Sequence, residues 1–163
     1  MTSFNILIDR FFHRIEADRD FFNYFNLTDN EAMELANQRA EALLYEATAL
    51  LSLRTTHDIN FADINNEDKC FNFDLTDKEI ILVSSFMYQQ YLERDIAKLK
   101  VLSVNYTSSN LKVFDPSNAR STFKELYEKV CADNDLLLDE YNNKDRETNQ
   151  FIRIDYGSYE EDI

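Results

Sequence analysis

Residues 76–96 read TDKEIILVSSFMYQQYLERDI and carry the pattern of a long buried helix. Thr76 and Glu79 form a capping box, in which the threonine oxygen accepts an amide of the first turn and the glutamate returns to the cap amide. The apolar residues that follow lie on all sides of a helix, which is typical of a helix buried on every side. After Leu92 the apolar residues lie on one side of the helix only. We expect a helix to about Tyr106, with its first half central in a bundle or in a subunit contact.

Two helices are expected before this one. Apolar residues recur at helical spacing over residues 3–16. Thr28 and Glu31 form another capping box. The helix that follows has an apolar stripe at steps of three and four, formed by Ala32, Ala36, Ala40, Leu43, Ala47 and Leu50. The many alanines predict the close approach of a neighbouring helix.

A fourth helix is expected after a polar turn. Asp115 is a suitable cap and Pro116 is favoured at the first helical position, and the apolar pattern ends near residues 142–143. Residues 54–75 predict an irregular connection, in which the alternation at 71–75 is compatible with a short strand. The expected fold is all-α: a four-helix bundle with one long central helix, an irregular loop between the second and third helices, and an extended C-terminal arm. The helical domain spans 1–143 and the arm 144–163.

The composition fits one acidic domain. The chain has 163 residues, 17 basic against 31 acidic side chains and a formal charge of −14. With one Gly and one Pro, it lacks the residues of a glycine-rich phosphate loop. Its charge argues against a groove that wraps nucleic acid. The N-terminus does not resemble a signal peptide, no stretch is apolar enough for a membrane span, and Cys70 and Cys131 are expected to be reduced. A soluble protein made in a cytoplasm is the expectation.

Chemical motifs point away from catalysis. His13 and His57 have no histidine partner at helical zinc spacing, and neither cysteine has metal-ligand spacing. Residues 63–74 open like a calcium loop, but Asp68 stands where such a loop needs glycine. We therefore expect no catalytic residue, no cofactor, no metal and no enzyme.

Two segments are candidate contact surfaces. Residues 94–130 have a net charge of +3, whereas the segments before and after have −10 and −7. Their basic residues are Arg94, Lys98, Lys100, Lys112, Arg120, Lys124 and Lys129. This segment either docks on the acidic region of another subunit or reflects ordinary surface variation. The aromatic residues Phe21 and Phe22 belong either to the core or to a subunit interface.

The C-terminal arm is the other candidate. Its apolar side chains stand among charges without helical period, and they are Phe151, Ile152, Ile154, Tyr156 and Tyr159. Such a segment is either an arm that orders on a partner or an idle terminus.

The order of these segments resembles a known family. Residues 73–79 (FDLTDKE) lead into 86–96 (FMYQQYLERDI), and a polar turn, residues 114–118 (FDPSN) and a last amphipathic helix follow. Together with the alanine-rich helix from Thr28, they resemble the head–tail connector proteins (adaptor or neck proteins) of tailed bacteriophages over roughly residues 21–142.

The resemblance implies a structural virion protein. Members form a ring of about twelve copies, a closed cyclic oligomer, beneath the portal at one capsid vertex. The ring joins head to tail and extends the channel for DNA packaging and DNA ejection, so DNA passes through without specific binding. The implied partners are the portal protein, further copies of the chain and a neighbouring neck or tail protein, with no membrane. A C-terminal arm commonly docks on the portal. The implied location is the neck of the virion, assembled in the bacterial host cytoplasm.

Two other classes stay open. An acidic inhibitor that mimics DNA would explain the charge of −14, although the acidic residues are scattered over helices and loops. An enzyme that uses Cys70 or a carboxylate is the third class.

Overall fold

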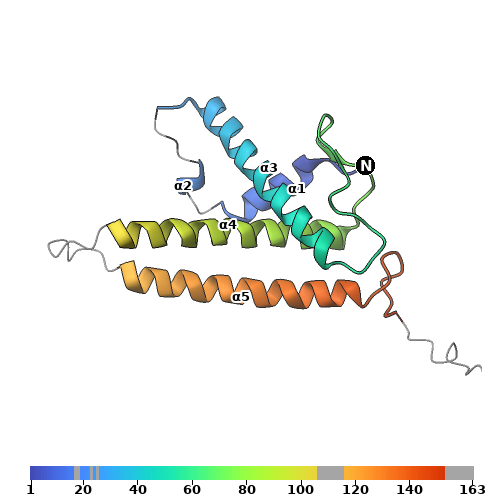
Figure 1. The fold of residues 1–163 in the computed structure, drawn as a ribbon. Coiled ribbons are helices and arrows are strands. Elements are labelled where there is room, and N and C mark those ends of the chain that lie inside the picture. The colour runs from blue at the N-terminus through green and yellow to red at the C-terminus, as the bar shows by residue number, and fades with distance from the viewer. Residues whose placement is uncertain (17–18, 23, 25, 106–115, 153–163) are drawn as a thin grey trace, which may run out of the picture.

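A computed structural model describes residues 1–16, 19–22, 24, 26–105 and 116–152, with the backbone alone for 19–20, 98–105 and 116–120. Within these residues four long helices pack together: α1 (Phe4–Arg14), α3 (Asp29–Arg54), α4 (Asp77–Asn105) and α5 (Pro116–Asn142). A single turn, α2 (Arg19–Phe22), follows α1. A small hairpin of β1 (Ile64–Asn65) and β2 (Cys70–Phe71) lies between α3 and α4. The predicted four-helix, mostly helical fold is confirmed (Figure 1).

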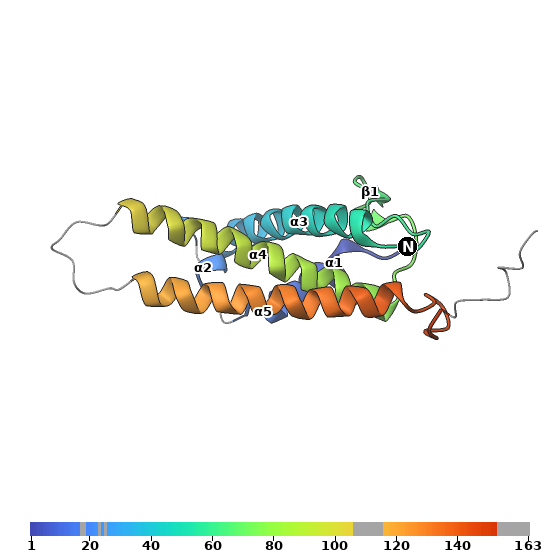
Figure 2. The ribbon, with the colours of Figure 1, turned by 60° about the horizontal axis from the view of Figure 1, so that its bottom comes forward.

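Helix α4 is the centre of the bundle. It packs against α1, α3 and α5, and Figure 2 shows it between α3 on one side and the antiparallel α5 on the other. Leu82, Val83, Phe86 and Met87 are buried, and so are Ser84 and Ser85, which confirms the prediction of a central first half except at Ile81, which is 38 % exposed.

The helix starts follow from local chemistry. At α3, the Thr28 amide donates to the Glu31 carboxylate at 2.9 Å and the Glu31 amide donates to the Thr28 hydroxyl at 3.5 Å, so the capping box is formed. At α4, the Thr76 amide donates to Glu79 Oε2 at 2.7 Å. Pro116 is the first residue of α5, as predicted.

The alanine stripe lies where α3 meets its neighbours. Ala36, Ala40 and Ala47 are completely buried, and α3 packs against both α1 and α4. Small side chains allow this close approach, so the prediction from the alanine spacing is confirmed.

The connection after α3 is more ordered than predicted. In the hairpin, Ile64 is opposite Phe71 and Asn65 is opposite Cys70. The turn is built by the Asn65 side chain, which accepts the amides of residues 67 and 68, and by Lys69 in the left-handed region (φ 49°). The N-terminal residues join it, because the Phe71 amide donates to the Thr2 carbonyl at 2.9 Å. The hairpin is thereby fixed to the start of α1.

The aromatic residues after α1 form part of the core. The Phe21 ring contacts the rings of Phe11 and Tyr91 edge-on, with centroids 5.7 Å away in both cases, and is 2 % exposed. Phe22 is half-buried against Phe12. Of the two interpretations given for Phe21, the core and a subunit interface, the structure therefore supports the core.

Residues 144–152 turn back on themselves, in contrast to the extended arm expected there. The Asp145 carboxylate accepts the amides of residues 147 and 148, and Asn149 is in the left-handed region (φ 58°). Lys144 and Phe151 form an antiparallel bridge, and the Ile152 amide donates to the Asn143 carbonyl at 2.9 Å. Short side chains that bond to their own backbone favour this turn over an extended segment.

Candidate functional site

Helix α5 has an apolar stripe that its own subunit leaves partly uncovered. Phe123, Leu126 and Leu137 are 38–40 % exposed, whereas Val130, on the same side of the helix, is 6 % exposed. At 100° per residue these four positions lie within about 60° of one another. We call Phe123, Leu126 and Leu137 the α5 stripe. Helix α5 packs against α4, and on this side of α5 Val130 is buried whereas the stripe stays accessible.

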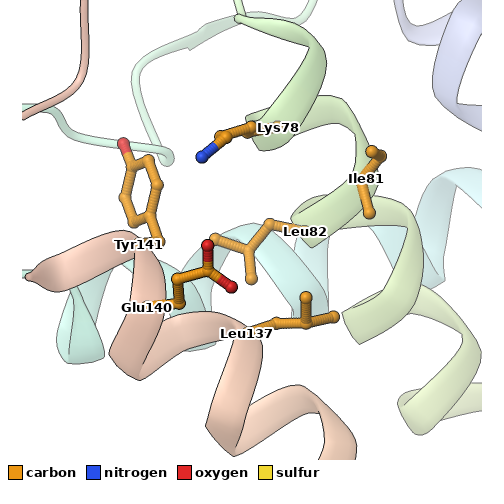
Figure 3. A pocket seen from close by; sticks show the side chains of 6 residues that line it. All are labelled: Lys78, Ile81, Leu82, Leu137, Glu140 and Tyr141. Carbon is orange, nitrogen blue, oxygen red and sulfur yellow. The ribbon is translucent and has the colours of Figure 1, made fainter. Parts of the chain in front are cut away.

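A pocket lies between α4 and α5 near the end of α5. It has a volume of about 190 Å³, and Figure 3 shows the residues that line it: Lys78, Ile81, Leu82, Leu137, Glu140 and Tyr141. Leu82 is buried, whereas Ile81 and Leu137 are partly exposed. The pocket combines an apolar lining with one cationic and one anionic side chain. It therefore fits an apolar side chain flanked by polar or charged groups.

A buried ion pair lies beside the pocket. The Glu79 side chain is fully buried and accepts hydrogen bonds from Arg146 Nε at 2.7 Å and from the Tyr141 hydroxyl at 2.6 Å. Its second oxygen accepts from the Thr76 amide at 2.7 Å and from Arg146 Nη2 at 3.1 Å. Arg146 also donates to the Asp74 carbonyl at 2.5 Å. One guanidinium thus joins the segment after α5 to the start of α4.

The pKa values around Glu79 follow from this geometry. Burial raises the pKa of Glu79, but the hydrogen bonds from Arg146, Tyr141 and Thr76 outweigh it and leave the pKa below its ordinary value. Burial, and then the hydrogen bond to the Glu79 carboxylate, raise the pKa of Tyr141. Glu79 therefore stays ionised with both oxygens occupied by donors, an arrangement suited to holding a segment in place rather than to moving protons.

Two of the five predicted arm residues lie within the described chain and three lie outside it. Phe151 and Ile152 are 69 % and 57 % exposed, and the Lys144 amine lies 5.0 Å from the centroid of the Phe151 ring. Ile154, Tyr156 and Tyr159 lie outside the described residues. The base of the arm therefore offers two apolar side chains to solvent.

Of the residues predicted for a subunit interface, Arg94, Phe21 and Phe22 have described side chains. Arg94 pairs with Glu46 of its own subunit at 2.6 Å. Lys98 and Lys100 lie on α4 where the backbone alone is described, and Lys112 lies outside the described residues. Phe21 is in the core. The α5 stripe, which belongs to the apolar pattern of the expected fourth helix, is partly exposed in the structure.

Sequence reasoning missed the pocket and the role of Arg146. Glu79 was identified as a capping residue, but its ion-pair partner lies 67 residues away in the sequence. No local periodicity connects two such residues, so the sequence carried no signal for this pair.

The described part of the chain shows neither a membrane span nor a metal site. None of its helices has both the length and the apolarity to cross a membrane. No three of its described His, Cys, Asp or Glu side chains come together as a set that could hold a metal ion. Comparisons with protein-family models, with curated proteins and with solved structures find no match to the chain.

Proposed function

We propose that this chain is a structural subunit of a bacteriophage neck, which forms a closed ring beneath the portal and extends the DNA channel between head and tail. The observation that carries the proposal is the α5 stripe, on a helix at one edge of an acidic helical bundle (Figure 2). Phe123 and Leu126 are neighbours on one side of α5, and adjoining exposed apolar side chains mark protein interaction sites. The proposal of a ring beneath the portal follows from the resemblance of residues 21–142 to head–tail connector proteins.

The stripe supplies one side of the contact between copies. Phe123 and Leu126 lie in the first half of α5, away from the pocket. A neighbouring copy that covers them with a different surface makes a heterologous contact, and repeating that contact closes a ring. The net charge of +3 on residues 94–130 beside strongly acidic flanking segments gives such a contact a direction.

The acidic composition suits a channel wall. Each copy has a formal charge of −14, so a ring concentrates negative charge around its axis. Negative walls repel phosphates and leave DNA free to slide. The ring then extends the channel for packaging and ejection without binding DNA specifically.

The arm supplies the contact with the portal. Phe151 and Ile152 are exposed at its base, and Arg146 fixes that base to α4. Ile154, Tyr156 and Tyr159 continue the apolar pattern outward. A tethered apolar segment of this kind is a suitable anchor on a larger protein.

The test is assembly with the portal protein encoded in the same genome. The tagged portal and this chain are co-expressed, purified on the portal tag, and examined by native mass spectrometry and electron microscopy. We expect rings of this chain on the portal. A chain that ignores the portal and instead captures one nucleic-acid-binding host protein contradicts the proposal and favours the DNA mimic.

A matched pair of variants tests the stripe. The double variant Phe123→Glu with Leu126→Glu should fold but fail to form rings, because charges then replace the apolar contact. The control is Leu136→Glu, since Leu136 is 69 % exposed on another side of α5. Rings formed equally by both variants would remove the stripe from the interface.

A truncation tests the arm. A chain that ends at Glu147 keeps Arg146 and its contacts with Glu79 but loses residues 148–163. It should fold normally and attach to the portal more weakly. Unchanged attachment would show that the arm has no part in it.

The DNA-mimic alternative has less support from the side chains. On α5, Asp135 pairs with Arg54 at 2.7 Å and Glu140 pairs with Lys144 of the same subunit. Carboxylates engaged in this way are less available to replace a row of phosphates.

A further inference from the structure

The start of α3 carries an apolar face that its own subunit leaves uncovered. Met33 is 51 % exposed, and Leu27, just before the capping residue, is 42 % exposed. At 100° per residue, Met33 lies about 20° from Ala40 and about 40° from Ala47, which are both completely buried. The buried side of α3 therefore continues to Met33, beyond the part of the helix that other elements cover. We call Leu27 and Met33 the α3 tip.

The residues around the α3 tip are acidic. Residues 26–38 contain three acidic side chains and no basic one, so their formal charge is −3. All three are exposed, and they are Asp29, Glu31 and Glu34. Glu31 is held by the capping box, whereas Asp29 makes no ion pair with any described side chain. Because Asp29 lies about 40° from Met33 around the helix, a free carboxylate adjoins the apolar face.

The start of α5 has the opposite charge beside its apolar face. Phe123 and Leu126 are 38 % and 40 % exposed, and the segment 94–130 that contains them has a net charge of +3. The nearest acidic residues of this helix, Glu125 and Glu128, lie about 100° or more from both apolar side chains. Lys129 lies about 60° from Leu126, is exposed, and pairs with no carboxylate among the described side chains. A free ammonium group therefore adjoins this apolar face.

The two faces lie on opposite sides of one subunit. Helix α4 packs against both α3 and α5 and lies between them (Figure 2). Helices α3 and α5 start toward the same end of the molecule (Figure 1). The α3 tip and the start of α5 are thus near one end of the bundle but separated by α4. A contact between them joins two copies, and each copy keeps one of its two faces for the next copy.

We propose that the α3 tip of one copy docks on the start of α5 of the next copy. Met33 inserts between Phe123 and Leu126, and Asp29 lies beside Lys129. Charge selects this pairing, because two α3 tips in contact would place −3 against −3. The pairing joins unlike surfaces, so it repeats from copy to copy until a ring closes. It rests on the proposed ring and names the surface that covers the α5 stripe.

A disulfide trap tests the pairing. The full-length chain carries Asp29→Cys and Lys129→Cys in a Cys131→Ser background, and Cys70 stays because it is buried. It is co-expressed with the portal protein of the same genome, and the whole lysate is oxidised with glutathione disulfide. The matched control replaces Asp29→Cys by Glu67→Cys, since Glu67 is an exposed acidic residue in the hairpin turn. Denaturing gels show bonded copies as a ladder of multimers, and peptide mass identifies the bonded positions.

The expected ladder is about tenfold stronger for the pair 29 and 129 than for the control pair. Adding Met33→Glu should reduce it to the control level. Ile6→Glu should leave it unchanged, because Ile6 is 50 % exposed on another helix, α1. Equal ladders for the two pairs, or a ladder that survives Met33→Glu, would overturn the inference. Bonds that join position 29 to 29 or 129 to 129 would also overturn it, since like surfaces would then meet.

Attachment to the portal is scored separately on the same lysate. A ladder through positions 29 and 129 in protein that does not attach to the portal supports the contact and contradicts the neck function. Portal-bound rings without this bond support the neck function and overturn the contact.

Discussion

Arg146, four residues beyond the end of α5, donates its Nε hydrogen to Oε1 of Glu79 in the first turn of α4 at 2.7 Å. The carboxylate is fully buried, whereas the Arg146 side chain is 29 % exposed. The pair closes the open end of the antiparallel α4–α5 hairpin, where the chain has no covalent connection between the two helices. It also sets the point from which the C-terminal segment leaves the bundle.

Replacing the buried carboxylate tests how much this pair contributes. Glu79→Gln keeps the size and the capping acceptor but removes the charge opposite Arg146. We expect the free energy of unfolding to fall by about 2–3 kcal/mol, below the usual cost of breaking a fully buried pair because Arg146 is partly solvated. Urea unfolding measures the change. Glu128→Gln breaks the exposed Lys124–Glu128 pair and should cost under about 0.5 kcal/mol.

The same carboxylate gives the stability a defined pH dependence. Its pKa in the folded chain lies below the ordinary value of 4.5, so the unfolded state binds more protons between the two values. Its stabilising contribution is therefore complete above pH 4.5 and is lost as the pH falls through the folded pKa. Unfolding free energies measured from pH 3 to 7 should fall more steeply in acid for the parent chain than for Glu79→Gln. Parallel curves for the two proteins would contradict this assignment.

The helices were predictable because their signals are local. Thr28, Thr76 and Pro116 each act on the turn that follows, and the structure begins a helix directly after both threonines and at the proline. The hairpin was not predictable in the same way. Its turn lacks glycine and depends on the Asn65 side chain and on Lys69 in a left-handed conformation, which other residue types adopt more readily.

The candidate site was predictable only in part. Phe151 and Ile152 are exposed, as an apolar arm requires, whereas Phe21 belongs to the core and Arg94 pairs within the subunit. The pocket and the Arg146 contact depend on how α4 and α5 align over their whole length. Such alignment is a tertiary property with no repeat in the sequence to reveal it.

The centre of the bundle gives a prediction that tests the placement of α4. Phe86 is fully buried, so Phe86→Ala should lower the free energy of unfolding by about 3–5 kcal/mol through the cavity it leaves. Phe86→Asp should unfold the subunit, because an unpaired carboxylate in the core is strongly unfavourable. Phe123→Ala on the α5 stripe should cost at most about 1.5 kcal/mol. Circular dichroism during urea titration distinguishes these outcomes, and a folded Phe86→Asp subunit would show that α4 is placed wrongly.

The contact between α4 and α5 contains a polar link that sets how the two helices align. Asn134 is buried, and its Nδ2 donates to Gln89 Oε1 at 2.8 Å and to the Ser85 carbonyl at 3.1 Å. Asn134→Leu should cost about 1–3 kcal/mol, since the Gln89 oxygen then stays buried without this donor.

Asn143→Ala is the matched control for this link. Its side chain makes a similar bond, to the Asp139 carbonyl at 2.8 Å, but in an exposed position, so the variant should cost under about 0.5 kcal/mol.

Adding Gln89→Leu to Asn134→Leu removes both partners, and the double variant should lose less stability than the sum of the two single changes. Strict additivity in thermal unfolding would mean that the two side chains do not depend on each other, and that the Asn134–Gln89 link does not set the alignment of α4 and α5.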